Sequence, residues 1–470
     1  MNYHTAMVFH VVAVPYPGRG HVNPMMNLCK SLLSSKTLHG HQILITFVVT
    51  QEWKTLIGTN HHMPHNIRIC TIPNVLPSEL TRGSDFAGFY EAVMTKMEAP
   101  FVAFIDQIET PITVIIADTE LLWVVPVSNH RHIPVALLWT SSVSVFSMFL
   151  HHHLFRRNGH LGIDLLENGE ERVEYIPGVS STRKADLPTI FDRNHERVLQ
   201  LTLQCIERVK EAQYLLFNSI YEIEQQVIDI LKPKYPFSLY TVGPAIPIFE
   251  INKDPPSNSN KPNYLQWLDS QATGSVLYVS LGSYLSVSHE QMEEVVAGVC
   301  DSGVKFLSVA REGNKPWLSH DCLVNGFVVP WCDQLRVLCH SSIGGFLSHC
   351  GWNSVLEASF AGVPILTFPI FFDQAPNSKQ IVEDWKVGLH GKAVVGARNV
   401  TREEISGLVQ RFMNSQSNEG KELRKRAKEV KEACRRAIVE GGSSIHDLNS
   451  FVLDVLRQVN KNKIPLHLTR

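Results

Sequence analysis

The stretch of residues 330–374 constrains the fold of this chain most strongly. Residues 344–348 (GGFLS) form a short apolar run typical of a buried strand, and residues 353–361 have the pattern of a helix. The residues between them, His-Cys-Gly-Trp, leave room only for a tight turn. Asn353 and Ser354 are residue types that cap helices. The pattern therefore predicts a strand, a turn and a helix start.

A helix start of this kind is suited to binding an anion. Its unpaired backbone N–H groups and the positive end of its dipole would point into the turn. Gly351 would let the backbone approach the anion closely, because glycine has no side chain. The stretch therefore predicts half of a nucleotide-binding site, with a diphosphate at the turn.

The remaining polar residues of the stretch fall where other parts of a nucleotide could be contacted. Trp331 offers a flat face for a base, whereas Gln334 and Glu357 offer hydrogen bonds to ribose hydroxyls. Asp373 and Gln374 close the stretch after a second predicted strand, residues 364–368. Together these residues could hold one ligand along its length.

This spacing closely resembles the signature box of plant family-1 UDP-sugar glycosyltransferases. The shared pattern is W-x-x-Q, HCGWNS, E and P-x-x-x-D-Q over residues 331–374, and so many typed positions at fixed spacing are far more specific than a lone glycine motif. Weaker similarity extends to VPYPGRGHVNP around His21, IIADTELLW around Asp118, YIPGVSSTRKADLP and VSLGS at Ser283. The resemblance implies an α/β protein of the GT-B fold, with two facing Rossmann-like domains and a cleft between them.

The resemblance also implies which residues bind the donor. The diphosphate would be contacted by His349 and by the residues around the predicted helix start. The donor residues that it implies are Ser283, Trp331, Cys332, Gln334, His349, Gly351, Trp352, Asn353, Ser354, Glu357, Asp373, Gln374 and Thr140.

Within this set, the resemblance gives Trp331 to uracil, the backbone at Cys332 to the base, and Gln334 and Glu357 to ribose. Trp352 would act through its backbone. Asp373, Gln374 and Thr140 would contact the sugar, and glutamine at position 374 is similar to the enzymes that use glucose. The chain departs from the family where Cys332-Asp333 replaces the commoner Ala-Pro and where Leu281 replaces a frequent phenylalanine.

The catalytic pair is implied in the same way. His21 corresponds to the general base that removes the proton of an acceptor hydroxyl, and Asp118 to the carboxylate that orients the imidazole. Taken alone, His21 is one of 22 histidines and Asp118 is as readily a turn cap at a strand end. Glu120 stands where an aromatic residue would be expected. We therefore expect the acceptor pocket beside the pair to be more polar than usual.

The implied activity is an inverting transfer of glucose from UDP-glucose to a hydroxyl of a small lipophilic metabolite of plant secondary metabolism, such as a phenolic, flavonoid or terpenoid. The acceptor pocket would be lined by parts of residues 86–97, 139–153 and 190–203. A non-catalytic sensor of nucleotide sugars with the same fold remains an alternative. A nicotinamide-dependent dehydrogenase is a second alternative, although residues 17–20 (PGRG) lack the G-x-G-x-x-G spacing that it needs.

Alternating strand and helix patterns predict parallel sheets that are covered on both faces. An N-terminal acceptor domain (1–242) contains predicted strands at 7–14, 43–50, 112–117, 134–138 and 214–218, and a helix at 24–33 that is expected to start just after His21. A linker rich in proline, asparagine and serine follows (243–262). The UDP-sugar domain (263–442) adds strands at 275–280 and 305–310 and helices at 289–302, 401–413 and 420–439. A helix and tail (443–470) could pack back on the first domain.

The composition excludes several kinds of partner. Lysine and arginine (43) nearly balance aspartate and glutamate (45), so no basic surface for nucleic acid or anionic lipid is expected. The nine cysteines are scattered without a C-x-x-C pair, which is typical of reduced thiols in a cytoplasmic protein. The apolar run at 7–14 leads into a Pro/Gly loop, and no run reaches the roughly 20 residues that span a bilayer. We expect a cytoplasmic monomer without a signal peptide or membrane segment.

Metal and cofactor chemistry are not expected either. Many sugar-nucleotide enzymes hold a divalent ion with a D-x-D pair, and no two aspartates of this chain are two residues apart. The histidine runs at 61–62 and 151–153 have no convergent ligands in sequence. The sequence thus predicts a metal-independent reaction with two small-molecule partners, the acceptor and the donor substrate UDP-glucose.

Overall fold

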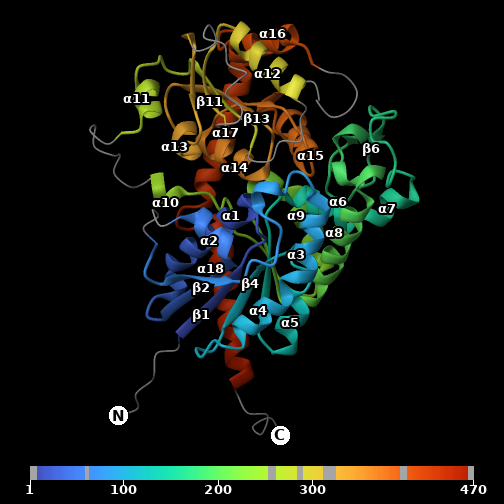
Figure 1. Ribbon diagram of the computed structural model, residues 1–470, viewed down its shortest axis with the longest axis vertical. Coiled ribbons are helices and arrows are strands. Elements are labelled where there is room, and N and C mark those ends of the chain that lie inside the picture. The colour runs from blue at the N-terminus through green and yellow to red at the C-terminus, as the bar shows by residue number, and fades with distance from the viewer. Residues whose placement is uncertain are drawn as a thin grey trace. The chain divides into compact units, whose positions relative to one another are not determined.

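A computed structural model describes residues 8–58, 63–251, 261–282, 289–310, 324–391 and 400–463 (Figure 1). The chain divides into two compact units. Unit 1 comprises Met1–His153, His195–Ala245 and Arg436–Arg470, and unit 2 comprises Leu154–Asn194 and Ile246–Arg435. Each unit is built around one parallel sheet, so the predicted architecture of two Rossmann-like α/β domains is confirmed.

The sheet of unit 1 has seven parallel strands in the order β3-β2-β1-β4-β5-β8-β9. Its strands are β1 (Val8–Val14), β2 (Gln42–Thr50), β3 (Ile67–Ile72), β4 (Val114–Asp118), β5 (Val135–Trp139), β8 (Tyr214–Phe217) and β9 (Leu239–Thr241). Its helices are α1 (Arg19–Leu33), α2 (Gln51–Ile57), α3 (Phe86–Lys96), α4 (Glu98–Ile105), α5 (Val124–His130), α6 (Val143–Leu150), α8 (Glu196–Arg208), α9 (Tyr221–Leu231) and α18 (Ser443–Lys463).

The strand residues of this sheet are buried on both faces. In β1, Phe9, Val11 and Ala13 join a cluster that also contains residues of α1, α2 and α18. Val12 and Val14 alternate with them and are equally inaccessible. Because successive side chains of a strand point to opposite faces, a fully buried strand of this kind needs cover on both sides.

Helix α1 begins earlier than the sequence predicts. Gly18 is its N-cap and Arg19 its first residue, so His21 lies in the first turn and not in the loop before it. The carbonyl of Gly18 accepts hydrogen bonds from the N–H groups of His21 and Val22, at 2.9 and 2.8 Å. The Asn23-Pro24 pair lies inside the helix, where the proline removes a single N–H donor.

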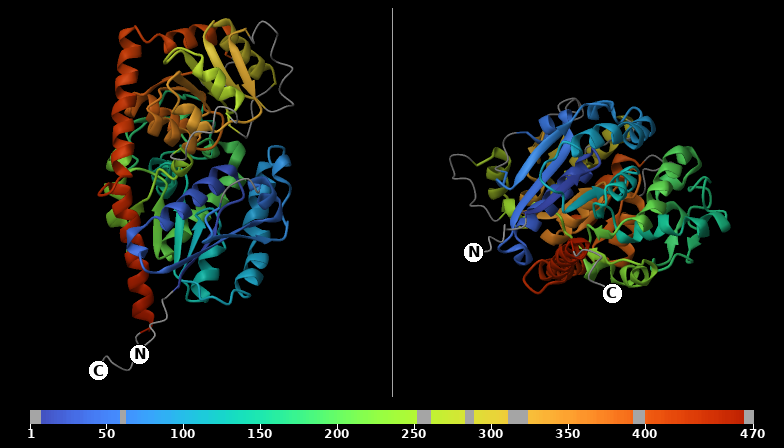
Figure 2. Two further views of the ribbon diagram at one scale, coloured as in Figure 1. Left: turned by 90° about the vertical axis from the view of Figure 1, so that its left-hand side faces the viewer. Right: turned by 90° about the horizontal axis from the view of Figure 1, so that it is seen from below.

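The C-terminal helix α18 is part of unit 1 (Figure 2). Its buried residues Leu448, Phe451, Val452 and Val455 belong to the same apolar cluster as β1. The side chain of Asp447 accepts hydrogen bonds from the backbone N–H and hydroxyl of Thr241, both at 2.8 Å. The last helix therefore completes a sheet whose first strand lies at the start of the chain.

The sheet of unit 2 has six parallel strands in the order β12-β11-β10-β13-β14-β15. Its strands are β10 (Val276–Ser280), β11 (Lys305–Val309), β12 (Gly326–Val329), β13 (Ile343–Ser348), β14 (Ile365–Thr367) and β15 (Gly388–His390). Its helices are α10 (Ile248–Ile251), α11 (Asn263–Asp269), α12 (His289–Asp301), α13 (Gln334–Leu338), α14 (Trp352–Ala361), α15 (Gln374–Lys379) and α16 (Arg402–Met413), while α7 (His152–Arg157) and α17 (Asn418–Ala437) each contribute residues to both units.

The division into units differs from the predicted boundaries mainly in one long segment, and residues 436–442, predicted in the UDP-sugar domain, also cluster with unit 1. Residues Leu154–Asn194 cluster with unit 2, although the sequence analysis put them in the N-terminal domain. They form the two-stranded antiparallel pair β6 (Arg172–Val173) and β7 (Thr182–Arg183), and Arg172 makes an ion pair with Glu383 at 2.9 Å. Sequence patterns report which residues are buried, but they do not report which neighbour buries them.

Seven cysteines of the described residues are free thiols, as expected: Cys29, Cys70, Cys205, Cys332, Cys339, Cys350 and Cys434. Cys300 differs, because it is disulfide-bonded. The expectation of reduced thiols throughout was therefore wrong at this position. Among the described residues, no helix is both long and apolar enough to cross a membrane.

Candidate active site

In unit 1 the predicted catalytic residues come from neighbouring strands. His21 follows β1 and Asp118 ends β4, and these two strands pair directly in the sheet. The strand order reverses between them, since β2 lies beyond β1 on one side and β5 beyond β4 on the other. In open α/β sheets, ligands bind at the carboxyl ends of strands at such a point.

The His21 side chain is held through its Nδ1 atom. Asp118 Oδ2 lies 2.8 Å from Nδ1, and the hydroxyl of Thr140 lies 3.0 Å from the same nitrogen. Because a carboxylate only accepts, Nδ1 carries a proton that it donates to Asp118, and in the neutral ring Nε2 is then the proton acceptor. The other oxygen of Asp118 accepts a hydrogen bond from the backbone N–H of Glu120 at 3.0 Å.

The electrostatics of this pair set the basicity of His21. Burial lowers its pKa, but the charge and hydrogen bond of Asp118, helped by the charge of Glu120, outweigh burial and raise the pKa to about 9. The Asp118 side chain is only 2% exposed, so little solvent screens its charge. Removal of the Asp118 charge would therefore make His21 a weaker base.

Glu120 is buried in the same place. A ring nitrogen of His21 and carboxylate oxygens of Asp118 and Glu120 all lie within 4.8 Å of one another, and they form the one group of described residues that could hold a metal ion. In the structure, His21 and Asp118 instead contact each other at hydrogen-bond distance. Glu120 is thus a second buried carboxylate beside His21, and the expectation of a more polar acceptor pocket stays a prediction.

In unit 2 the predicted diphosphate site also lies at a strand-order reversal. β10 and β13 are adjacent, Gly282 follows β10, and His349 follows β13. Cys350 has a φ of 67°, and α14 starts at Trp352 with Gly351 as its N-cap. Asn353 and Ser354 were predicted as caps but lie within the first turn, and the N-cap residue Gly351 has no side chain to cap the helix. A helix start is a common position for a bound anion, because its first backbone N–H groups have no intrahelical acceptor.

The His349 ring packs between two glycines. A Cβ atom at Gly282 would lie 2.7 Å from His349 Nε2, and one at Gly351 would lie 2.5 Å from it, so neither position has room for a side chain. The Nδ1 atom is buried without a hydrogen-bond partner among the residues that the structure describes. Burial, opposed by the backbone of Ser280, lowers the pKa of His349 to about 4. At neutral pH this imidazole is uncharged and can donate from one nitrogen only.

The predicted ribose residues form a connected network. The Nε2 atom of Gln334 donates to Glu357 Oε2 at 2.6 Å and to Ser354 Oγ at 3.0 Å, and its Oε1 accepts from the Tyr278 hydroxyl at 3.1 Å. Burial raises the pKa of Glu357 to about 7, although the bond from Gln334 acts in the opposite direction. The carboxylate is therefore poised between its charged and neutral forms.

Trp331 and its two neighbours behave differently from one another. Trp331 is 65% exposed, as a stacking platform for a base would be, whereas Cys332 is buried against the Tyr278 hydroxyl at 3.4 Å. Asp333, a departure from the family pattern, is the N-cap of α13 and accepts a hydrogen bond from the Arg336 N–H at 3.1 Å. Its charge thus has a structural function in the described chain.

The predicted sugar residues Asp373 and Gln374 follow a turn that hydrogen bonds stabilise. Gln374 Oε1 accepts from the backbone N–H groups of Ile370 and Phe371, at 2.8 and 3.0 Å. The Asn377 amide donates to Asp373 Oδ2 and to the Cys350 carbonyl, each at 3.0 Å, and so joins this turn to the one after β13. The other predicted sugar residue, Thr140, contacts His21 in unit 1. Ser283 lies outside the described residues.

Residues 173–422 match the model of the family described as UDP-glucoronosyl and UDP-glucosyl transferase. The chain is 48% identical over 450 residues to UDP-glycosyltransferase 87A2 of Arabidopsis thaliana, and this match covers 94% of the chain and 96% of that relative. The chain belongs to this family.

Solved plant structures have the same fold as this glycosyltransferase. Phytolacca americana UGT2 complexed with UDP-2fluoro-glucose and pterostilbene has a TM-score of 0.78 and 26% identity, with 95% of this chain and 99% of that chain covered. Medicago truncatula UGT71G1 complexed with UDP-glucose has a TM-score of 0.76 and 26% identity, with 95% and 98% covered. The predicted family, the GT-B fold class and the transfer of a sugar from a UDP-sugar are confirmed, and the dehydrogenase alternative is wrong.

One contact of unit 2 of this glycosyltransferase could not have been found from the signature. Thr189 pairs with Phe372, because its N–H donates to the Phe372 carbonyl at 2.9 Å and its hydroxyl accepts from the Phe372 N–H at 2.7 Å. Phe372 has a φ of 60° directly before Asp373. A segment far away in sequence thus holds the backbone next to the Asp-Gln pair, and its only signal in the sequence was the weaker family similarity of residues 175–188 (YIPGVSSTRKADLP).

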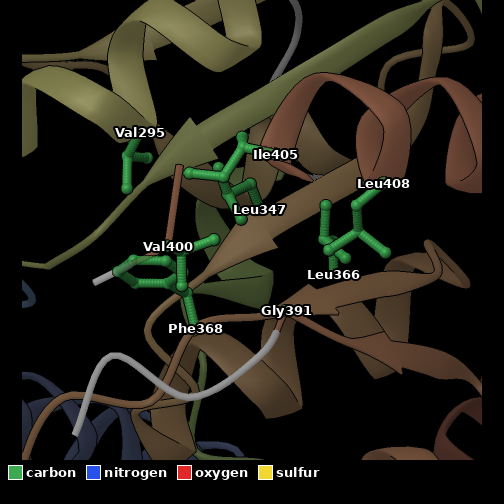
Figure 3. Close-up of a pocket in the computed structure, with 8 residues that line it drawn as sticks. All are labelled: Val295, Leu347, Leu366, Phe368, Gly391, Val400, Ile405 and Leu408. Carbon is green, nitrogen blue, oxygen red and sulfur yellow. The ribbon is translucent and has the colours of Figure 1, made fainter. Parts of the chain in front are cut away.

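A small pocket in unit 2 of this glycosyltransferase lies elsewhere (Figure 3). It has a volume of about 20 Å³, and the described residues that line it are Val295, Leu347, Leu366, Phe368, Gly391, Val400, Ile405 and Leu408. A space with only apolar walls stays dry and offers no group for chemistry. It is a packing defect of the core between β13, β14, α12 and α16.

Proposed function

We propose that this glycosyltransferase transfers glucose from UDP-glucose to a hydroxyl of a small, lipophilic acceptor, with inversion at the anomeric carbon. His21 acts as general base and Asp118 as the residue that orients it. Unit 1 binds the acceptor, and unit 2 binds the donor. The observation that carries the proposal is the 2.8 Å contact between His21 Nδ1 and Asp118, which directs Nε2 toward proton removal.

The reaction proceeds as a single displacement. His21 Nε2 takes the proton of the acceptor hydroxyl as its oxygen forms a bond to the anomeric carbon of glucose. The bond from that carbon to the β-phosphate oxygen breaks on the opposite face, and UDP departs with the electron pair. The proton stays on His21, where the charge of Asp118 stabilises the imidazolium, until solvent removes it.

The donor is held by groups with separate tasks. Trp331 stacks on uracil, and Gln334 and Glu357 form hydrogen bonds with the ribose hydroxyls. The start of α14 and His349 compensate the negative charge that develops on the departing UDP. Asp373 and Gln374 hydrogen-bond sugar hydroxyls, which favours glucose over an epimer because a displaced hydroxyl leaves a buried group unsatisfied. The two solved plant relatives that carry UDP-glucose or its fluoro analogue support this choice of donor.

The decisive experiment replaces His21 by alanine. Turnover on an accepted phenol should fall by about 10²–10⁴-fold, because a positioned general base contributes that factor. UDP affinity, measured by calorimetry, should stay within about twofold of wild type, because the nucleotide residues belong to unit 2. The control is His130→Ala, which removes an exposed histidine of α5.

Three results would contradict the proposal. More than half of the wild-type turnover in His21→Ala would exclude the general-base role. Loss of turnover in excess chelator, restored by magnesium or manganese, would instead assign the His21, Asp118 and Glu120 group to a metal ion. Wild-type protein that binds UDP-glucose but transfers it to no acceptor would favour the sensor alternative.

A further inference from the structure

The side of unit 1 next to His21 carries an acidic residue that the mechanism above does not use. Glu120 has only 8% of its surface exposed, and its carboxylate lies within 4.8 Å of the His21 and Asp118 ligand atoms. Its backbone N–H is tied to Asp118 at 3.0 Å, which fixes where the side chain starts. A carboxylate has about four lone-pair sites, so it can accept a bond from a substrate in addition to those it makes within the protein.

A buried hydroxyl in the same place has no partner. Tyr16 is 2% exposed, its ring centroid lies 4.8 Å from that of His21, and its hydroxyl has no hydrogen-bond partner among the described residues. Burial and then the charge of Glu120 raise the pKa of Tyr16, so the phenol keeps its proton and can donate. Buried polar groups are nearly always paired in folded proteins. This exception points to a polar group that the protein does not supply.

Aromatic rings pack next to Tyr16. Tyr16 lies 6.3 Å from Phe89 and 5.8 Å from Tyr90, and Phe86 lies 5.8 Å from Tyr90, measured between ring centroids. Such a wall favours a flat aromatic ligand by edge and offset contacts. The polar atoms and the rings therefore describe one kind of acceptor, an aromatic ring with more than one hydroxyl.

We propose that Glu120 and Tyr16 select acceptors with two hydroxyls on neighbouring ring carbons, that is, ortho-dihydroxyphenyl compounds. One hydroxyl gives its proton to His21 and attacks the sugar. The second hydroxyl keeps its proton, donates it to the Glu120 carboxylate and accepts a hydrogen bond from Tyr16. A ring nitrogen of His21 and a carboxylate oxygen of Glu120 lie within 4.8 Å of each other, a separation that two hydroxyls on neighbouring ring carbons can bridge. This inference rests on the proposed function, since it takes His21 as the base.

The test compares two acceptors that differ by one hydroxyl, 4-methylcatechol and 4-methylphenol, with UDP-glucose as donor. Wild type should show a kcat/KM ratio of at least about tenfold in favour of the catechol, the factor that one buried hydrogen bond typically provides. The ratio should fall severalfold in Tyr16→Phe, which removes only the hydroxyl, and approach one in Glu120→Leu. Glu98→Gln, at an exposed position of α4, is the matched control and should keep the wild-type ratio.

Each other outcome overturns the inference, and its pattern shows what has failed. Equal kcat/KM for both acceptors in wild type refutes the selection while the proposed function stands. A ratio that Glu120→Leu leaves unchanged, with both pH profiles shifted alike, shows that Glu120 acts only through the charge of His21. Transfer to aliphatic alcohols but to neither phenol refutes the acceptor class. If no acceptor is glucosylated at all, the proposed function is refuted, and the inference is refuted with it.

Discussion

The surroundings of two histidines of this glycosyltransferase shift their pKa values in opposite directions. His21 lies beside two carboxylates, which raise its pKa to about 9 against the effect of burial. His349 lies between two glycines, and burial lowers its pKa to about 4. Environments that push the pKa values of like groups apart commonly separate their roles. Here one imidazole suits proton removal and the other suits a neutral hydrogen bond.

The raised pKa of His21 predicts a pH-dependent rate. A general base must be unprotonated, and His21 is protonated below about 9, so kcat/KM should rise with pH and level off near that value. Asp118→Asn removes the main group that raises the pKa. The rise should then move to lower pH, and the plateau should fall by about 10²-fold or more. Initial rates between pH 6 and 10 measure both effects, and a profile that Asp118→Asn leaves in place would contradict them.

Glu357 predicts a second pH dependence, in donor binding. Ribose hydroxyls donate best to an ionised carboxylate, and Glu357 ionises near pH 7 in the unliganded protein. UDP affinity should therefore weaken as the pH falls from 8 to 6, because binding must then expel a proton. Calorimetry of wild type and Glu357→Gln over this range is the measurement. The variant should bind more weakly than wild type with no pH dependence of this origin, and an equal slope in both would rule the effect out.

At the residue scale, the signature predicted which positions lie near one another but not how they are bonded. His21 and Asp118 were expected to pair, and their 2.8 Å contact agrees with that expectation. Thr140 was assigned to the sugar, and in the structure its hydroxyl contacts His21. Asp333 was predicted only as a departure from the family pattern, and in the structure it is the N-cap of α13. A helix of five residues has too little periodicity for the sequence to reveal its cap.

At the scale of elements, the segment Leu154–Asn194 has a task that its sequence conceals. Thr189 pairs with Phe372 through two hydrogen bonds and holds the residue before Asp373 in a left-handed conformation. A bulky residue at positive φ is unfavourable and persists only where its surroundings fix it. The proposed sugar contacts of Asp373 and Gln374 therefore depend on a segment that the sequence analysis put in the other domain.

This pairing can be tested with an isosteric change. Thr189→Val keeps the shape but removes the oxygen that accepts the Phe372 N–H, a loss of about 1–3 kcal/mol for a buried group. The KM for UDP-glucose should rise by about tenfold or more, whereas UDP affinity should not change, since only the sugar end is disturbed. Thr182→Val is the control, because that hydroxyl bonds Ser180 in the same segment. Parallel weakening of UDP and UDP-glucose would show a general disturbance instead.

Long, apolar elements were the ones that the sequence predicted. Strands β1, β2, β10 and β13 and helices α16 to α18 lie within a few residues of their predicted positions. Strands β3, β9, β12 and β15 were not predicted. β9 and β15 have three residues each, and β3 has exposed and half-buried side chains that hide the apolar pattern. The start of α1 was misplaced because proline marks a first turn only by preference.

At the scale of the whole molecule, both sheets use the same point of their topology. β1 and β4 in unit 1, and β10 and β13 in unit 2, are the adjacent strands at which the order reverses, and each pair carries one of the two histidines. The alternation of strand and helix patterns was enough to predict two such sheets. The return of the chain to the first sheet, which the sequence analysis considered for residues 443–470, does not follow from this alternation, because no local pattern records a partner several hundred residues away.

The return of α18 should be measurable as stability. Phe451 is fully buried, and its ring lies 5.4 Å from Tyr214 and 5.7 Å from Tyr240. Phe451→Ala should lower the free energy of unfolding by about 3–5 kcal/mol, the usual cost of removing a buried ring. Leu453→Ala, on the same helix but 41% exposed, should change it by less than about 1 kcal/mol. Urea titration of both variants compares them, and similar midpoints would mean that α18 does not support the core.

The place of α18 also determines when the protein can fold during its synthesis. A ribosome makes the chain from its first residue, and N-terminal domains commonly fold before the rest has emerged. Here the core around β1 lacks Leu448, Phe451, Val452 and Val455 until all of unit 2 has been translated. During translation, the N-terminal half of the chain therefore exposes the part of its apolar core that α18 covers in the complete protein. We therefore expect this chain to depend on chaperones during translation more than a chain whose units are each continuous in sequence. Truncation within α18 should impair folding of the N-terminal half.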